Sequence, residues 1–189
     1  MILDALKQET RQQHAHLEEL NSLPRNTSDY VRLLEGFWGI IVPWEEHLAA
    51  ALPAEDPLRA GREKAGWLRD DLTFFGYSPA RLAALPRCPA LPATPSRAHL
   101  LGGCYVIEGS TLGGQVIARH LAAVLGLRAG QGDRYFRSYG GETAARWQEF
   151  RAELVRHSSP ENDAIMIRSA QEMFAVLAHW FGRRSAAAA

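Results

Sequence analysis

The sequence has no excess of charge of either sign, because its 21 lysine and arginine residues equal its 21 aspartate and glutamate residues. A protein that binds nucleic acid through phosphates is expected to carry a basic excess, so the composition argues against that class. No apolar run approaches the roughly 18 residues that a membrane-spanning helix needs. The chain also does not begin with a basic segment followed by an apolar one, as a secretory signal does. We therefore expect a cytoplasmic protein that binds neither nucleic acid nor a membrane.

Cysteine is scarce as well, since the 189 residues include only Cys88 and Cys104 and no Cys-x-x-Cys pair. This count gives no support to a disulfide framework. No stretch alternates strictly between apolar and polar residues, as a half-buried strand does. Helix-length segments separated by proline and glycine instead predict an all-α fold. We expect a single-domain multi-helix bundle over residues 1–185, followed by a frayed alanine tail at 186–189.

The expected helices follow from start and stop signals along the chain. Ser28 is the expected N-cap of the second helix, and Pro43 is expected to kink that helix. The proline-rich stretch 86–95 is expected to be a connector. The helices are predicted at about 2–20, 28–51, 58–75, 79–85, 96–125, 142–157 and 160–181, with a short turn at 134–139.

The segment from Tyr105 to Arg119 has the residues of one long helix, yet glycine occupies positions 109, 113 and 114. Each interior glycine costs roughly 1 kcal/mol relative to alanine, so three of them need a reason. Gly109 and Gly113 are four positions apart and share one helix face. Two interpretations are open: a close crossing of two helices, or a bent helix that lies over a flat cofactor.

On the first expected helix, His14 stands where an apolar stripe meets a basic one. At about 100° per residue, Lys7, Arg11 and Glu18 fall within about 60° of His14. An imidazole that binds a metal, with Lys7 and Arg11 meeting carboxylates, suits an apolar, metal-centred ligand. Glu18 can hold the second ring nitrogen of His14. An ordinary amphipathic helix with a boundary histidine is the alternative.

Together these two stretches resemble the heme oxygenases, most closely the bacterial group found with bacteriophytochromes. Leu-Lys-x-x-Thr-x-x-x-His at 6–14 resembles the proximal-ligand helix of that family, and Glu-Gly-Ser-Thr-Leu-Gly-Gly-Gln at 108–115 resembles its distal helix. Trp-Leu-x-x-Asp-Leu-x-x-Phe-Gly at 67–76 is similar to a family segment between them. The resemblance implies a fold in which heme is sandwiched between an N-terminal proximal helix and a glycine-rich, kinked distal helix.

The resemblance also implies the residues of the site, with His14 as the ligand of the heme iron. The implied heme-binding residues are Lys7, Arg11, His14, Glu18, Gly109, Gly113, Gly114, Arg151 and Phe174. For Arg151 a solvated helix face is the alternative, and for Phe174 plain core packing. Implied catalytic residues are Gly109, Ser110 and Gly113, because the glycines leave room for oxygen and the Gly113 amide can donate a hydrogen bond to it. Many relatives carry Asp where this chain has Ser110, and a hydroxyl is a weaker anchor for the water that supplies protons.

The activity that the resemblance implies is the cleavage of heme to biliverdin, carbon monoxide and ferrous iron, with the biliverdin supplied to a bacteriophytochrome. Heme is then both substrate and cofactor, and O2 is the second substrate. The chain has no nucleotide or flavin motif of its own, so an external electron donor, ferredoxin-like or another reductase, is expected. The alternatives are a heme carrier or sensor that does not cleave heme, and a heme-free helical relative that acts on a small molecule or holds a non-heme metal pair.

Overall fold

The computed structural model describes residues 1–20 and 23–186, and these residues form helices and loops without any β-strand. The expected all-α class is therefore confirmed. Of the expected alanine tail at 186–189, residues 187–189 lie outside this range. The elements are α1 (Ile2–Glu9), α2 (Arg11–Leu20), α3 (Thr27–Ala51), α4 (Ala65–Phe74), α5 (Pro79–Ala83), α6 (Arg97–Leu125), α7 (Arg134–Arg137), the 3-10 turn η1 (Gly140–Glu142), α8 (Thr143–Arg156) and α9 (Pro160–Ala186).

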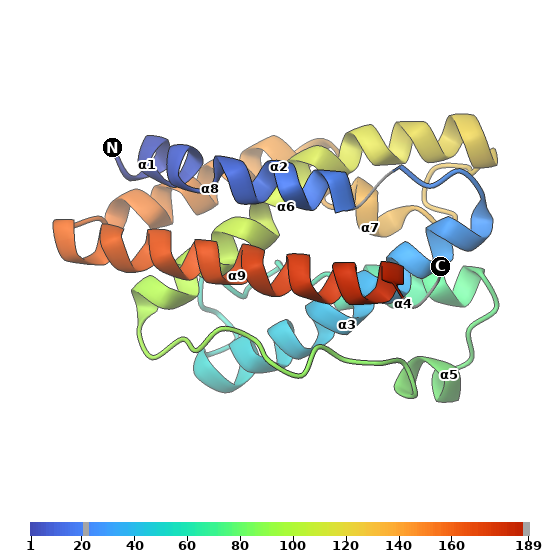
Figure 1. Ribbon diagram of the computed structural model, residues 1–189, viewed down its shortest axis with the longest axis horizontal. Coiled ribbons are helices and arrows are strands. Elements are labelled where there is room, and N and C mark those ends of the chain that lie inside the picture. Colours follow the sequence, from blue (N-terminus) through green and yellow to red (C-terminus); the bar gives the residue numbers. More distant parts are fainter. Residues whose placement is uncertain (21–22, 187–189) are drawn as a thin grey trace.

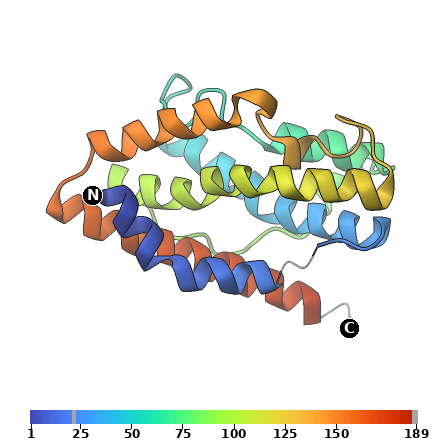
Figure 2. The ribbon, with the colours of Figure 1, turned by 90° about the horizontal axis from the view of Figure 1, so that it is seen from above.

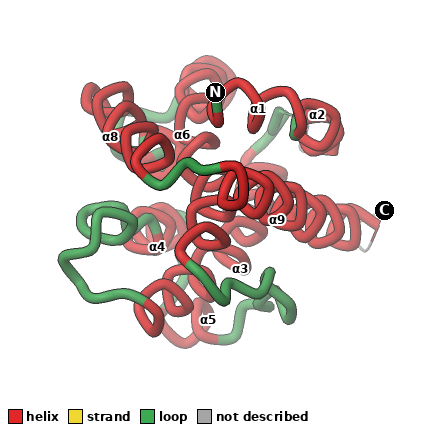
Figure 3. Tube along the Cα trace, turned by 90° about the vertical axis from the view of Figure 1, so that its left-hand side faces the viewer, coloured by secondary structure: helices red, strands yellow, loops and turns green. Residues whose placement is uncertain are grey.

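The glycine-rich helix α6 is the central helix of the bundle and packs against α7, α8 and α9. Seen from above, α6 runs through the middle, with α8 on one side and the α1, α2 and α9 group on the other (Figure 2). Figure 3 shows the bundle from one end, with α3, α4 and α5 below α9 and with α1, α2 and α8 above it. Figure 1 shows the axis of α6 changing direction along its length, although the helix is unbroken from Arg97 to Leu125.

The expected first helix at 2–20 is divided into two helices, because the helical conformation is interrupted at Thr10. The Thr10 hydroxyl donates to the carbonyl of Leu6 at 2.7 Å, a side-chain bond that competes with the helical backbone pattern. Leu6 and Ile2 are buried in the core, whereas α2 has no fully buried residue and lies against α9. The break therefore allows α1 to enter the core while α2 remains partly open to solvent.

Two other helix starts differ from expectation. Helix α3 is capped by Asn26 and not by Ser28, since the Asn26 side chain accepts a hydrogen bond from the amide of Asp29 at 2.9 Å. The helix continues through Pro43 to Ala51. Helix α4 begins at Ala65, seven residues later than expected. Residues 52–64 form an irregular connector that ends where the carboxylate of Glu45 accepts the backbone amides of Lys64 and Ala65. A side chain from another helix thus sets the start of α4, which local sequence signals do not reveal.

The large aromatic side chains differ in burial. Trp44, Phe150 and Phe181 are buried, whereas Phe74 is 52% exposed. Glu153 is only 6% exposed and pairs with Arg156 at 3.1 Å and with Arg97 at 3.8 Å. A buried carboxylate needs such partners, and Arg97 comes from the start of α6.

Candidate functional site

One face of α6 is left open in the structure. We call Gly109, Leu112, Gly113 and Val116 the glycine face, because they share one side of the helix. Within residues 1–20 and 23–186, a Cβ atom placed on Gly113 would meet nothing within 4 Å, and one on Gly109 would meet only the Trp147 ring, at 3.8 Å. Leu112 and Val116 are 44% and 54% exposed. No described helix crosses at Gly109 or Gly113, so the structure does not support the helix-crossing interpretation at these positions.

Gly114 does not belong to this face. It is buried, and a Cβ atom at this position would come within 2.5 Å of the carbonyl oxygen of Phe136 on α7. Gly102 is similar, since its Cβ would meet the Met166 carbonyl oxygen of α9 at 2.3 Å. The close-approach interpretation therefore holds for Gly102 and Gly114. The close approach of α7 is therefore sufficient to require glycine at 114, and the grouping of Gly114 with the heme-binding glycines stays a prediction.

Helix α2 runs alongside α6 in both views of the ribbon (Figures 1 and 2). The two segments touch at the ends of α2. The side chain of Tyr105 of α6 lies near that of Thr10, just before α2, and the His120 ring nitrogen Nε2 lies 2.8 Å from the carbonyl oxygen of Pro24, a few residues after α2. Tyr105 and His120 share the side of α6 that carries Gly109 and Gly113. The glycine face thus lies between two points at which α6 contacts the segment that contains α2.

The structure brings together three of the residues expected on the proximal side. The His14 Nδ1 atom is 3.6 Å from Oε2 of Glu18, and the His14 ring lies edge-on to Phe174 of α9 with the centroids 5.9 Å apart. The His14 side chain is 57% exposed, and within residues 1–20 and 23–186 no group hydrogen-bonds to its Nε2 atom. An imidazole with one nitrogen facing a carboxylate and the other open has the arrangement of a metal-bound histidine.

The three cations expected at the edge of the site lie on two elements. Lys7 and Arg11 are exposed and line one open pocket of about 660 Å³ together with Gln8 and Gln171, among others; His14 does not line this pocket. Arg151 is half-buried on α8 and donates to the side-chain oxygen of Gln148 at 3.2 Å. Because α1 packs against α8, the helix that carries Lys7 contacts the helix that carries Arg151.

Ser110 and the Gly113 amide are more constrained than the sequence suggested. The Ser110 hydroxyl donates to the carbonyl oxygen of Ile107 at 2.8 Å, although the residue is exposed. The Gly113 amide lies inside the unbroken helix α6, where an amide normally bonds to the carbonyl four residues earlier. The Gly113 amide must therefore share its hydrogen with a helix carbonyl when it donates to a ligand, whereas the Ser110 hydroxyl must share it or turn away from Ile107.

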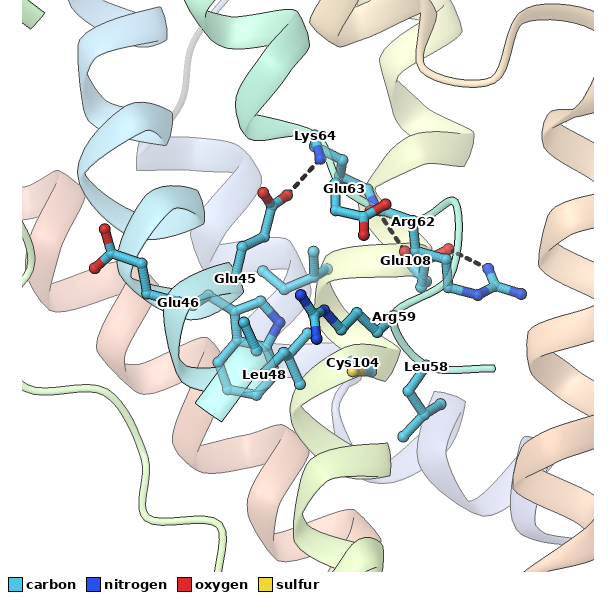
Figure 4. A pocket seen from close by; sticks show the side chains of 13 residues that line it. Glu45, Glu46, Leu48, Leu58, Arg59, Arg62, Glu63, Lys64, Cys104 and Glu108 are labelled. Carbon is cyan, nitrogen blue, oxygen red and sulfur yellow. Dashed lines mark hydrogen bonds and ion pairs between the residues drawn. The ribbon is translucent and has the colours of Figure 1, made fainter. Parts of the chain in front are cut away.

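Sequence reasoning missed a buried ionic group directly behind the glycine face. We call Arg62, Lys64, Glu108 and Tyr139 the Glu108 cluster. Arg62 Nη1 donates to Glu108 Oε2 at 2.7 Å, Lys64 Nζ donates to Glu108 Oε1, and the Tyr139 hydroxyl donates to the same carboxylate at 3.1 Å (Figure 4 shows the first three residues). The one available signal was a glutamate in an apolar stretch immediately before Gly109.

A small pocket of about 270 Å³ opens beside this cluster, with Trp44, Leu58 and Cys104 in its wall (Figure 4). Although burial by itself lowers the pKa of the Lys64 ammonium, the Glu108 carboxylate raises it above its ordinary value. Burial raises the pKa of the Cys104 thiol to about 12, so the thiol stays protonated and unreactive, as expected of a small buried residue.

The described residues contain no group of three or more His, Cys, Asp or Glu side chains placed to hold a metal ion. A non-heme metal pair therefore has no ligand set in this part of the chain. None of the helices in the same residues is long and apolar enough to cross a membrane.

Comparison with known proteins identifies similar folds. The model of the heme oxygenase family matches residues 1–183, whereas no curated protein sequence matches the chain. A heme oxygenase from Leptospira interrogans superimposes with a TM-score of 0.73 at 18% identity, over 96% of this chain and 98% of that one. Heme oxygenase 2 from Chlamydomonas reinhardtii, in a structure without heme, gives 0.71 at 18% identity over 96% of both chains. The NO- and CO-bound heme oxygenase from Neisseria meningitidis gives 0.68 at 20% identity, over 96% and 92%.

Proposed function

The chain belongs to the heme oxygenase family, and on this premise we propose that it binds heme between α2 and α6 and cleaves it in the presence of O2 and a reductant. The observation that carries the proposal is the glycine face, which stays unpacked although the segment containing α2 touches α6 on either side of it. A flat apolar molecule fits a face of this kind, which is apolar and has no side chain at two of its four positions.

The residues around this space fit heme. His14 would hold the iron through its open Nε2 atom, and Glu18 would orient the ring from Nδ1. The cationic side chains of Lys7, Arg11 and Arg151 would pair with the two propionates. Phe174, which is buried and contacts His14, would keep the imidazole from turning away.

Bound heme supplies an iron that activates oxygen and a macrocycle that is itself consumed. The protein would contribute room for oxygen beside the heme and a hydrogen-bonded path that supplies protons to it. Gly109 and Gly113 leave room above the ring, and a larger side chain at either position would fill it. The Ser110 hydroxyl can anchor a water molecule while it donates to Ile107, but it cannot act as a carboxylate.

We also propose biliverdin, carbon monoxide and ferrous iron as the products, and cytoplasmic supply of biliverdin to a bacteriophytochrome as the role. The support for this finer assignment is the motif resemblance at 6–14 and 108–115. Electrons would come from an external ferredoxin-like donor or another reductase, because no nucleotide or flavin motif occurs in the sequence.

The test is a heme titration followed by turnover in air. The purified apoprotein is titrated with hemin and the Soret absorption is followed. Ascorbate, or ferredoxin with its reductase, is then added with and without O2. We expect stoichiometric binding and then O2-dependent loss of the Soret band with formation of biliverdin, identified by chromatography. Binding without loss of the band would make the protein a heme carrier, and no binding would indicate a heme-free relative.

A further inference from the structure

The glycine face leaves one side of α6 without the packing that normally holds a helix in position. Among the described residues, only Trp147 comes within 4 Å of the Cβ positions of Gly109 and Gly113, and Leu112 and Val116 are 44% and 54% exposed. Glycine in a helix interior also leaves the backbone more freedom than any other residue. This part of α6 must therefore be held in place from its other sides.

Three contacts hold it there. The Glu108 carboxylate accepts hydrogen bonds from Arg62, Lys64 and Tyr139. Gly114 lies against the backbone of α7, and Gln115 Nε2 donates to the carbonyl oxygen of Arg137 at 2.9 Å. Glu108, Gly114 and Gln115 are all on sides of α6 that point away from Gly113.

The elements that provide these contacts are themselves fixed by two carboxylates, of which Glu45 is half-buried and Asp71 is buried. Glu45 of α3 accepts the amides at the start of α4, next to Lys64. Asp71 of α4 accepts the amides of Arg134 and Tyr135 at 2.9 and 2.8 Å, at the start of α7. Helix α7 then leads to Tyr139, which returns to Glu108. The polar contacts form a closed ring through α4, α7 and α6, and Glu45 of α3 joins this ring at the start of α4.

Stability alone does not explain a buried ionic group of this kind. Glu108, Arg62 and Lys64 are 4%, 7% and 2% exposed. Removing charges from water is costly, and apolar side chains of similar volume often give equal or greater stability. Directional bonds, however, define one geometry, which apolar packing does less strictly. This contrast points to a role in placing α6.

We propose that Glu108 is a positioning residue: through Arg62, Lys64 and Tyr139 it fixes where the backbone of Gly109 and Gly113 lies relative to α2 and His14. The inference rests on the proposed heme oxygenase function of the glycine face. Glu108 does not touch heme in this assignment. It sets the distance and the angle, relative to heme, of the Gly109 and Gly113 backbone that does touch heme.

The test uses Glu108→Gln, which keeps the size of the side chain and removes its charge, and Tyr139→Phe, which removes one donor. Glu153→Gln is the matched control, because Glu153 is also buried and also pairs with a residue of α6. Its partner there, Arg97, lies twelve residues before Gly109, about 18 Å along the helix axis. A triple variant, Arg62→Met with Lys64→Met and Glu108→Leu, replaces the charged side chains by apolar ones. This variant takes the place of Glu108→Gln if Glu108→Gln does not fold.

Three readouts are compared. The first is hydrogen–deuterium exchange of the peptide that contains residues 105–117 in the apoprotein, which we expect to become faster in Glu108→Gln and in the triple variant but not in Glu153→Gln. The second is the stretching frequency of carbon monoxide bound to ferrous heme, which we expect to shift or split in the same variants. The third is the turnover rate, which we expect to fall roughly 10- to 100-fold, as after a small misplacement of reacting groups.

Heme affinity is expected to change less than threefold, because His14 and the cations at the edge do not contact the cluster. Turnover of Glu108→Gln should be lower at every pH with the shape of the pH profile kept. Normal exchange and an unshifted carbon monoxide band in the Glu108 variants would overturn the inference, and so would loss of one limb of the pH profile, which would make Glu108 a proton donor. Failure of the wild type to bind or cleave heme would instead reject the proposed function.

Discussion

The imidazole ring of His14 lies edge-on to the ring of Phe174, with their centroids 5.9 Å apart, and this contact joins α2 to the long helix α9. Phe174 is buried, whereas the His14 side chain is 57% exposed. The ring of the candidate iron ligand therefore rests on the core while one of its nitrogens stays accessible. A ligand supported in this way needs little rearrangement when heme binds.

The first prediction concerns this ligand. His14→Ala should abolish the absorption spectrum of histidine-ligated ferric heme and the turnover, because no other described imidazole is placed beside Glu18 and Phe174. Added imidazole should restore part of both signals. His16→Ala is the control, since His16 lies two residues further on, on the other side of α2. Loss of the spectrum in His16→Ala but not in His14→Ala would show that the ligand is misassigned.

The second prediction concerns the cations. Lys7→Glu, Arg11→Glu and Arg151→Glu should each weaken heme binding by about 1 kcal/mol, roughly fivefold, because partly exposed charge pairs contribute at this level. The altered contacts should also change the ratio of biliverdin isomers, since they determine how heme is rotated in its site. Hemin titration and chromatography of the product check both effects. Arg168→Glu, an exposed arginine of α9, is the control. Three variants with wild-type affinity and isomer ratio would contradict the assignment.

The third prediction compares two neighbouring glycines. Gly114→Ala should destabilise the apoprotein by about 1–3 kcal/mol, because the new methyl group overlaps the Phe136 carbonyl oxygen. Gly113→Ala should leave stability unchanged or raise it by up to about 1 kcal/mol, because the methyl group meets open space in a helix interior. Urea denaturation of the apoproteins provides the comparison. Equal losses in the two variants would mean that the face at Gly113 is packed in solution.

The larger substitution Gly113→Leu extends this test to function. The apoprotein should fold with near-normal stability, because the side chain enters open space. Heme should still bind through His14, but the biliverdin yield should fall steeply, because the leucine side chain fills the room that oxygen needs. The melting temperature and the yield are measured on the same preparation. A strong loss of apo stability with a normal yield per folded molecule would place the pocket elsewhere.

The fourth prediction concerns pH and the buried carboxyl of Asp71. Burial raises its pKa from the ordinary 3.8 to about 6, although the amides of Tyr135 and Arg134 favour the carboxylate. Between these two values the folded protein holds a proton that the unfolded chain has released. The contribution of Asp71 to the free energy of unfolding should therefore fall as pH rises from about 4 to about 6, by at most about 3 kcal/mol.

Denaturant unfolding of the wild type and of Asp71→Asn at several pH values measures this contribution. The asparagine stays neutral throughout, so the stability of the wild type relative to the variant should decrease as pH rises through the window. Asp70→Asn, which removes an exposed carboxylate from the same helix, is the control. A difference between wild type and Asp71→Asn that does not depend on pH would contradict the raised pKa.

Local sequence signals were sufficient for the helical class and for most helix positions. The α5 and α8 helices and the end of α6 lie within two residues of their predicted positions. Helical periodicity, proline and the glycine after α6 act within a few residues, so they can be recognised without knowledge of the fold. The spacing of Lys7, Arg11, His14 and Glu18 belongs to the same category, and the Nδ1–Oε2 distance between His14 and Glu18 agrees with it.

The sequence by itself determined that this chain forms a helical bundle with a histidine-bearing helix near its start and a glycine-rich helix in its middle. Only the tertiary structure decided which glycines are open, because the partner of Gly114 is the carbonyl of Phe136, and Gly113 has no such neighbour among the described residues. It also decided that Glu108 is buried with Arg62, a residue 46 positions away in the chain. Contacts of this range depend on how the helices pack and leave no periodic signal in the residues that make them.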